Sequence, residues 1–275
     1  MNTYTLSEIN IFPVKSLGGI SVSSAKVEAR GLALDRQWLL INNENMFLTQ
    51  REIPAMALVK VKVEDNGLTF FHRDFPNESV TIGIQQFEKE SIKVGIWNDD
   101  CWANIVSEQA SEWFSEAFGM DCRLVKMAAH EQRLVDTNYA FNKEVVSFAD
   151  GFPVLIIGQS SLDDLNSRLP NAVEMNRFRP NLVFEGGIPY EEDSWQKFSV
   201  GEVSFLGVKP CARCVLTTVN PDKGEIDSKE PLRTLATYRN RNNKILFGQN
   251  LLAAHFGEIK VGDKIEVHTR GNMLF

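Results

Sequence analysis

The chain has 275 residues, of which 43% are hydrophobic and 24% are charged, and its formal net charge is −7. A chain of this length buries roughly three quarters of its unfolded surface and forms one large or two ordinary domains. The negative charge argues against a nucleic-acid partner. No apolar run reaches the ~18 residues of a membrane span, and the first residues lack a signal peptide, so we expect a cytoplasmic protein without a membrane partner.

The first hundred residues predict short β-strands joined by turns. A strand over 4–12 is ended by Pro13, and residues 37–41 and 46–49 predict a hairpin. Apolar residues alternate with polar ones in the segments that follow, which predicts strands over 58–63, 68–71, 80–84 and 92–96. This pattern is typical of a barrel or a sandwich.

A helix over 107–118 interrupts the strands. Apolar residues recur there at helical spacing, Ser107 is a suitable N-cap, and Gly119 is a suitable end. We place a domain boundary shortly after this helix, which gives an N-terminal domain over 1–125 and a C-terminal domain over 126–275. Residues 128–148 predict a long connection, and loops of that length are uncommon unless they are functional.

The second half mixes strands with short helices. A helix is predicted over 160–169, where Ser160 and Asp163 stand at capping-box spacing, and another over 231–238. Residues 259–261 and 265–267 predict a closing hairpin. Further strands are predicted over 153–157, 182–184, 203–206 and 215–219.

Cys211 and Cys214 stand three residues apart, with Arg213 between them and Lys209 just before them. A structural zinc site needs four ligands, and the other two of the four cysteines lie far away in sequence. A thioredoxin-like pair belongs between a strand and a helix. Two inert buried thiols are a third interpretation. The fourth is a single thiolate ligand for a metal that prefers soft ligands, with Arg213 and Lys209 favouring the thiolate.

Five cations are candidates for binding an anion: three of them stand beside turn-forming or extended segments, where backbone N–H groups are free to bind anions, and guanidinium groups pair well with phosphate. These residues are Lys15, Arg36, Arg51, Arg177 and Arg179. Each is also an ordinary surface residue by type, and their spacing does not establish that they converge. The acidic run 191–193 is predicted to be solvated, so we assign it no catalytic role.

Several motifs resemble the MOSC domain family. The C-terminal motifs are Asn176 to Asn181, Glu192 to Trp195, Cys211 to Thr218 and Leu246 to Gln249. The N-terminal motifs Phe12 to Ser16, Asp35 to Trp38 and Thr49 to Arg51 resemble the β-barrel domain that precedes MOSC in the amidoxime-reducing branch. The resemblance runs nearly end to end. It implies a mainly β fold with some α: an N-terminal β-barrel-like domain and a MOSC β-barrel with peripheral helices.

The resemblance also implies a molybdenum cofactor, in which a phosphorylated pterin (molybdopterin) holds the metal, and a family-level association with pyridoxal phosphate. Cys214 matches the family's metal ligand and catalytic cysteine, while Cys211 has no assigned role. Ala212 replaces a Ser of the family, and Asn250 replaces an aromatic residue. The matching cofactor-binding positions are Lys15, Ser16, Arg36, Asp150, Gly151, Phe152, Arg179, Asn181, Ala212, Arg213 and Asn250.

The activity that the resemblance implies is reduction of small N-hydroxylated compounds: amidoximes, hydroxylamines and N-hydroxylated bases. Some bacterial relatives append an iron–sulfur domain, whereas this chain has no cysteine beyond Cys214. We therefore expect electrons from a separate protein, either a flavoprotein reductase or a small redox carrier. Two alternatives remain open: a cofactor carrier or sulfur-transfer protein without turnover of a small substrate, and a non-catalytic module that binds an anionic ligand.

Overall fold

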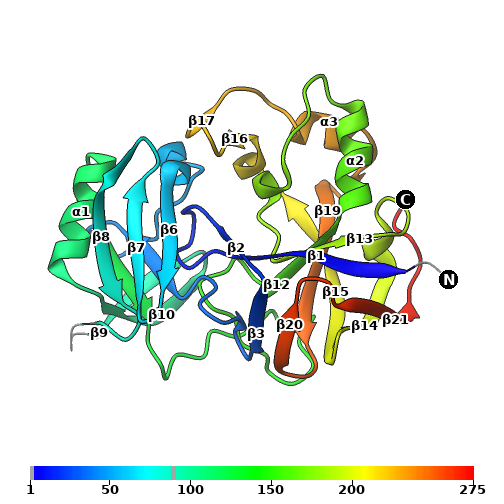
Figure 1. The fold of residues 1–275 in the computed structure, drawn as a ribbon, viewed down its shortest axis with the longest axis horizontal. Coiled ribbons are helices and arrows are strands. Elements are labelled where there is room, and N and C mark those ends of the chain that lie inside the picture. Colours follow the sequence, from blue (N-terminus) through cyan, green and yellow to red (C-terminus); the bar gives the residue numbers. More distant parts are fainter. Residues whose placement is uncertain (1–2, 88–90) are drawn as a thin grey trace.

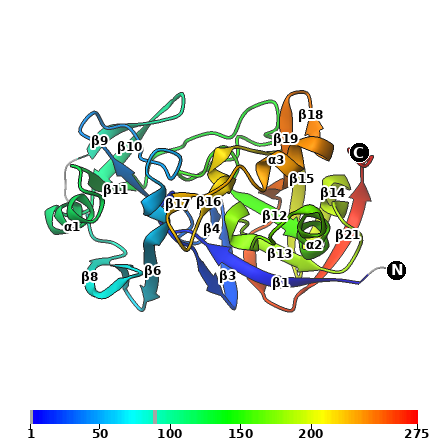
Figure 2. The ribbon, with the colours of Figure 1, turned by 90° about the horizontal axis from the view of Figure 1, so that it is seen from above.

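The computed structural model describes residues 3–87 and 91–275, which form two β-rich lobes side by side (Figure 1). The N-terminal lobe carries α1, and the C-terminal lobe carries α2 and α3 (Figure 2). The predicted fold class, mainly β with an N-terminal barrel-like domain and a MOSC barrel, is confirmed. No helix in the described ranges is long and apolar enough to cross a membrane.

The C-terminal lobe is built on a sheet that closes on itself, because β19 pairs with both β15 and β12. Only the pair β12–β13 in this ring is parallel. Its core includes Leu6, Phe184, Trp195 and Phe205, all fully buried. The ring runs in the order β12 (Val154–Gly158), β13 (Leu182–Glu185), β1 (Tyr4–Ile11), β21 (Lys264–Arg270), β14 (Trp195–Val200), β15 (Val203–Arg213) and β19 (Lys244–Ala253).

Two helices cover this barrel on one side: α2 (Gln159–Arg168) and α3 (Leu232–Tyr238). They pack on a second apolar cluster that contains Phe178 and Phe247, whose ring centroids are 4.4 Å apart. Four short strands extend the sheet or pair locally, namely β2 (Ile20–Val22), β18 (Asn240–Arg241), β16 (Val219–Asn220) and β17 (Glu225–Ile226). A separate small sheet contains β3 (Ser24–Glu28), β4 (Gly31–Leu32) and β20 (Gly257–Lys260).

The N-terminal lobe joins two antiparallel sheets and α1 (Glu108–Phe118) around Trp38, Phe70 and Phe114. As predicted, the Ser107 hydroxyl caps α1 by accepting from the Ala110 amide, and Gly119 ends the helix at φ 64°. One sheet contains β5 (Trp38–Ile41), β11 (Arg123–Met127), β10 (Asp99–Ile105) and β9 (Ser91–Ile96). The other contains β6 (Val59–Glu64), β7 (Gly67–His72) and β8 (Phe75–Gly83), preceded by the 3₁₀ turn η1 (Pro54–Leu58).

Three predictions of local secondary structure are wrong. The predicted strand over 215–219 is mostly the 3₁₀ turn η4 (Val215–Thr218), and the strand lies before Cys214, as β15. The predicted closing hairpin does not form, because β20 pairs with β3 while β21 pairs with β1 and β14. The capping box of α2 is also absent, since Gly158 is the N-cap and the Ser160 hydroxyl has no partner within the described residues.

The acidic run at 191–193 is buried, which contradicts the prediction that it is solvated. It forms the 3₁₀ turn η3 (Glu191–Ser194), and each of the three acidic side chains has a hydrogen-bond or ion-pair partner. Glu191 accepts from the Tyr4 hydroxyl at 2.6 Å and pairs with Arg270, while Asp193 pairs with Arg239 at 2.5 Å. The run therefore links β1, β21 and the end of α3 through hydrogen bonds and ion pairs.

The predicted boundary near residue 125 stays a prediction. β1, from the first predicted domain, pairs with β13 and β21 of the second. The predicted long connection lies between β11 and β12, where residues 128–153 contain one isolated bridge, Leu134 to Val145.

Candidate functional site

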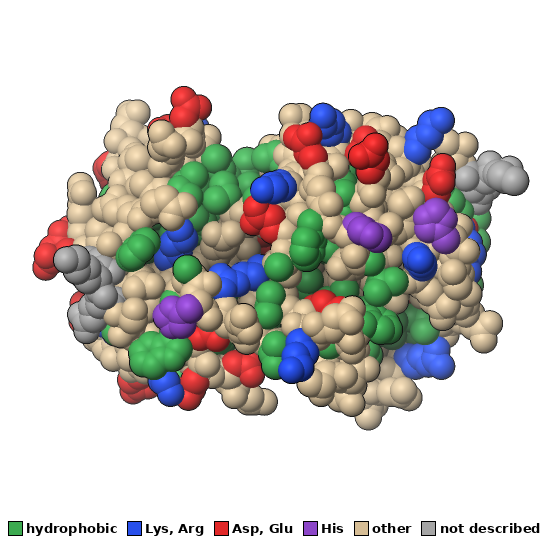
Figure 3. All heavy atoms as spheres, turned by 90° about the horizontal axis from the view of Figure 1, so that it is seen from below, with side chains coloured by type: hydrophobic (Ala, Val, Ile, Leu, Met, Phe, Trp, Pro, Cys, Tyr) green, Lys and Arg blue, Asp and Glu red, His purple; other side chains and the backbone are tan. Residues whose placement is uncertain are grey.

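A cavity of about 330 Å³ contains all twelve residues proposed from the sequence. This volume is within the range of small-molecule sites. Seen from below, Lys and Arg side chains lie near the middle of the face, between the lobes (Figure 3). The proposed residues that line the cavity are Lys15, Ser16, Arg36, Asp150, Gly151, Phe152, Arg179, Asn181, Ala212, Arg213, Cys214 and Asn250.

Left-handed backbone conformations shape the cavity wall at three of these positions. Ser16 has φ 68°, Arg36 has φ 49° and Arg179 has φ 53°. Positive φ is uncommon outside glycine, and such residues cluster at functional sites, where surrounding contacts hold them. Ser16 and Arg36 lie in turns between strands, and Arg179 ends η2 (Met175–Phe178), so the backbone turns sharply at the cavity.

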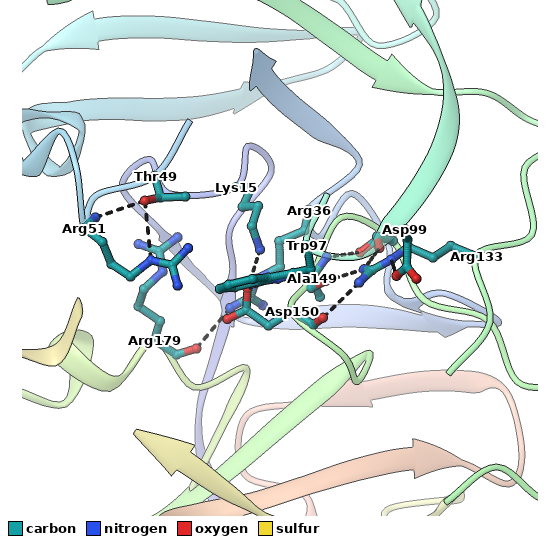
Figure 4. Close-up of polar contacts among 11 residues, drawn as sticks. Lys15, Arg36, Thr49, Arg51, Trp97, Asp99, Arg133, Ala149, Asp150 and Arg179 are labelled. Carbon is teal, nitrogen blue, oxygen red and sulfur yellow. Dashed lines mark hydrogen bonds and ion pairs between the residues drawn. The ribbon is translucent and has the colours of Figure 1, made fainter. Parts of the chain in front are cut away.

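Lys15 forms an ion pair across the cavity with Asp150, with Nζ 2.5 Å from Oδ1 (Figure 4). The Lys15 side chain is 8% exposed, whereas that of Asp150 is 74% exposed because it faces the open cavity. Burial lowers the pKa of Lys15, and Asp150 partly opposes this. Desolvation by the protein around the cavity would raise the pKa of Asp150, but Lys15, Arg36 and Trp97 hold it well below its ordinary value. Burial and the ion pair therefore act in opposite directions on each of the two pKa values, and water in the cavity screens the pair.

Arg36 is fixed by three acceptors. Its guanidinium donates to Asp35 Oδ2 at 2.6 Å, to Asn181 Oδ1 at 3.1 Å and to the Arg179 carbonyl at 3.2 Å. The Asn181 amide also accepts from the Leu155 amide and donates to the Asn10 carbonyl. Asn181 is 1% exposed and is held by these hydrogen bonds. It therefore positions the Arg36 guanidinium that donates to it.

Arg179 stacks on the same ring as Arg36, with its guanidinium carbon 4.2 Å from the centroid of Phe12. It donates to the Leu17 carbonyl at 2.7 Å. Burial, and then the neighbouring Arg36 charge, lowers the pKa of Arg179 to about 9. Arg179 is therefore still protonated at neutral pH, and the cavity holds closely spaced positive charges.

The two thiols of the Cys-x-x-Cys segment differ in environment. β15 ends at Arg213, and Cys214 lies exposed between β15 and η4, on the cavity wall. Cys211 is half-buried against the Phe178–Phe247 cluster, and burial raises its pKa. Within the described ranges, no three His, Cys, Asp or Glu side chains form a metal-binding group. A 3₁₀ turn follows Cys214, so the strand–helix context of a thioredoxin-like pair is also missing.

The donor set fits an anionic ligand that carries a soft metal. Nη2 of Arg179 and Nη2 of Arg213 are buried and have no hydrogen-bond partner in the described part of the chain. Buried donors without acceptors cost free energy, which an anionic oxygen close to them would recover. An accessible thiol beside them suits a sulfur-rich metal centre. The residues present therefore fit a phosphorylated, metal-bearing cofactor.

Sequence reasoning missed several residues of the cavity wall, and Trp97 is the most prominent. It occupies the turn between β9 and β10 and reaches Asp150, which is far away in sequence. The sequence feature that could have identified Trp97 is a large aromatic residue at the junction of a predicted strand and a turn. Arg51 and Cys211, which the sequence analysis named without a cofactor-binding role, also line the cavity. The remaining cavity residues outside the proposed set are Thr49, Ala149, Leu155, Phe178, Leu216 and Thr217.

Comparison with known proteins confirms the resemblance. Residues 3–121 match the MOSC N-terminal beta barrel domain, and residues 143–266 match the MOSC domain. The chain is 36% identical to mitochondrial amidoxime-reducing component 1 of Mus musculus, over 95% of this chain and 81% of that protein. It is 33% identical to mitochondrial amidoxime reducing component 2 of Bos taurus, with 95% and 82% covered.

A molybdenum cofactor sulfurase of Oryza sativa subsp. japonica is 33% identical over 88% of this chain, which spans 32% of that longer protein. Among solved structures, the YUAD protein from Bacillus subtilis covers 98% of this chain and is covered over 97% of its own length. Its identity is 10% and its TM-score is 0.45, too low to carry an argument. None of these similar proteins supports the expected association with pyridoxal phosphate. The chain belongs to the MOSC family, as a member that carries the N-terminal MOSC β-barrel domain and is homologous to the mitochondrial amidoxime-reducing components.

Proposed function

We propose that this protein is a molybdenum-cofactor-dependent reductase of small N-hydroxylated compounds. The observation that carries the proposal is the gathering of all twelve expected residues around one cavity, with the exposed Cys214 thiol on its wall. Homology to amidoxime-reducing components supports the same activity. When bound, the cofactor supplies two-electron redox chemistry, and the net reaction consumes two electrons and two protons while the N–O oxygen leaves as water.

The protein's own groups bind and orient in this proposal. The Cys214 sulfur ligates the metal, and the guanidinium groups of Arg36, Arg179 and Arg213 with the Lys15 ammonium bind the anionic pterin and phosphate. Asp35 and Asn181 hold Arg36 in place through the hydrogen bonds described above. Electrons come from a separate redox protein, and the cytoplasmic location also stays a prediction.

The test is reduction of benzamidoxime to benzamidine by freshly purified protein, made in a host that synthesises the pterin. Reduced methyl viologen serves as the donor, and elemental analysis gives molybdenum per chain. We expect about one molybdenum per chain and turnover that scales with it. Molybdenum-loaded protein that leaves benzamidoxime unchanged would refute the reductase.

The match to a molybdenum cofactor sulfurase favours one other candidate, a cofactor carrier or sulfur-transfer protein. In that case Cys214 accepts sulfur or metal without turnover of a small substrate. Stable cofactor, no reduction of benzamidoxime and transfer of molybdenum to a recipient apoenzyme would identify the carrier.

A further inference from the structure

Trp97 has an unusual backbone position on the cavity wall. It is the first residue of the two-residue turn between β9 and β10, since Ile96 pairs with Asp99 across the turn. Its φ is 58°, and positive φ in such turns is normally supplied by Gly, Asn or Asp. A bulky residue there is an outlier, and outliers of this kind persist where surrounding contacts enforce them.

Contacts from two segments far apart in sequence hold the Trp97 ring. Its indole Nε1 donates to Asp150 Oδ1 at 3.2 Å, and the Arg51 guanidinium carbon lies 4.2 Å from the ring centroid. The Phe47 ring packs at a centroid distance of 5.2 Å. In Figure 4, Trp97 lies between Arg51 on one side and Arg133 on the other. The ring is fixed, although 43% of the residue remains exposed.

Arg133 also connects the same turn to the loop that carries Asp150. Arg133 Nε donates to Asp99 Oδ2 at 2.7 Å, and the same guanidinium donates to the carbonyls of Ser147, Ala149 and Asp150. The Arg133 side chain is 5% exposed. Arg133 is thus a positioning residue, which sets the distance between the Trp97 turn and the cavity wall.

We propose that Trp97 is the substrate-binding surface on which a planar, uncharged ring of the substrate stacks. This inference rests on the proposed function. It predicts that the enzyme prefers N-hydroxylated compounds that carry a ring to aliphatic ones. An indole that is exposed and already immobilised in a cavity loses little conformational freedom when it stacks. The cations beside it, Arg51 and Lys15 at 5.9 Å from the ring centroid, oppose a positively charged substrate.

The test compares benzamidoxime with acetamidoxime, which share the reacting group and differ in the ring. Trp97→Ala lowers the ratio of kcat/KM for benzamidoxime to that for acetamidoxime by about tenfold, because a stacked ring contributes on the order of a tenfold preference. Trp97→Phe restores part of the ratio. Rates are expressed per bound molybdenum.

Trp102 provides the matched control. It is 40% exposed and lies on β10 of the same hairpin, but it pairs with Lys93 and does not line the cavity. Trp102→Ala keeps the wild-type ratio. A Trp97→Ala variant with the wild-type ratio, or a Trp102→Ala variant with an equal loss, would overturn the inference.

Calorimetry without an electron donor separates this inference from the reductase proposal. Benzamidoxime binds wild-type protein about tenfold more tightly than acetamidoxime, and Trp97→Ala removes the difference. If neither compound is reduced but this difference is found, the reductase proposal fails and the binding surface stands. Equal affinity of the two compounds for wild-type protein overturns the binding surface.

Discussion

Glu192 makes the stability of this protein depend on pH in a predictable direction. Its side chain is fully buried, and its carboxylate accepts from the Gly158 amide at 3.2 Å and from the Ser161 hydroxyl at 2.9 Å. Burial, and then the adjacent Asp193 charge, raises the pKa of Glu192 from 4.5 to about 7. Between these two values, folded Glu192 keeps a proton that the unfolded chain has released.

The folded state therefore binds more protons than the unfolded state in this window, and the free energy of unfolding falls as pH rises. The slope is about 1.4 kcal/mol per pH unit. Over the window from 4.5 to 7, the contribution of this one group amounts to about 3 kcal/mol. It is fully present below pH 4.5 and lost above about pH 7.

Glu192→Gln copies the protonated carboxyl and removes its titration. Urea unfolding of both proteins at pH 4.5 and pH 7.5 measures the effect. The stability of the variant relative to wild type rises by about 3 kcal/mol between these pH values. Asp164→Asn is the control: hydrogen bonding from Arg168 lowers the pKa of Asp164 below its ordinary 3.8, so its effect stays constant over this range. Parallel curves for Glu192→Gln and wild type would refute the reasoning.

Three further predictions concern the cavity. Cys214→Ser abolishes molybdenum binding and benzamidoxime reduction. It changes the free energy of unfolding by less than about 0.5 kcal/mol, because the thiol is exposed. Cys211→Ser retains the metal, and equal metal loss in both variants would favour a dithiol or zinc site. Arg36→Gln costs about 3–5 kcal/mol in urea unfolding, because it leaves the fully buried Asp35 carboxylate without its cationic partner. A cost below about 1 kcal/mol would contradict this. Arg133→Met speeds hydrogen exchange in the backbone segment 147–150, whose carbonyls it binds, and unchanged exchange would show that the segment does not depend on it.

Local patterns in the sequence predict the elements whose packing is also local. α1 has helical spacing, a serine cap and a terminal glycine, and all three features are present in the structure. The segment 215–219 has β-favouring composition but turns into η4, because tertiary contacts outweigh propensity over so short a stretch. β20 and β21 are separated by a tight turn, yet each pairs with a strand from the beginning of the chain. Partners so remote leave no signal in local periodicity.

The site was predictable through family motifs and not through spacing. Lys15, Arg36 and Arg179 lie far apart in sequence, and only the closure of the barrel and the packing of the two lobes bring them together. Trp97 escaped notice because its role depends on a contact to Asp150, 53 residues away. The acidic run was misjudged for the same reason, since Arg239 and Arg270, which pair with it, come from later segments.

β1 gives the barrel a particular order of assembly. Tyr4 pairs with Ile265 and Leu6 pairs with Phe184. β1 is therefore synthesised long before the strands with which it pairs, β13 and β21. Contacts of such long range slow folding, and a waiting strand offers open edges to neighbouring chains. Translation must therefore reach β21 before the ring of strands that includes β15, at whose end Cys214 lies, can close.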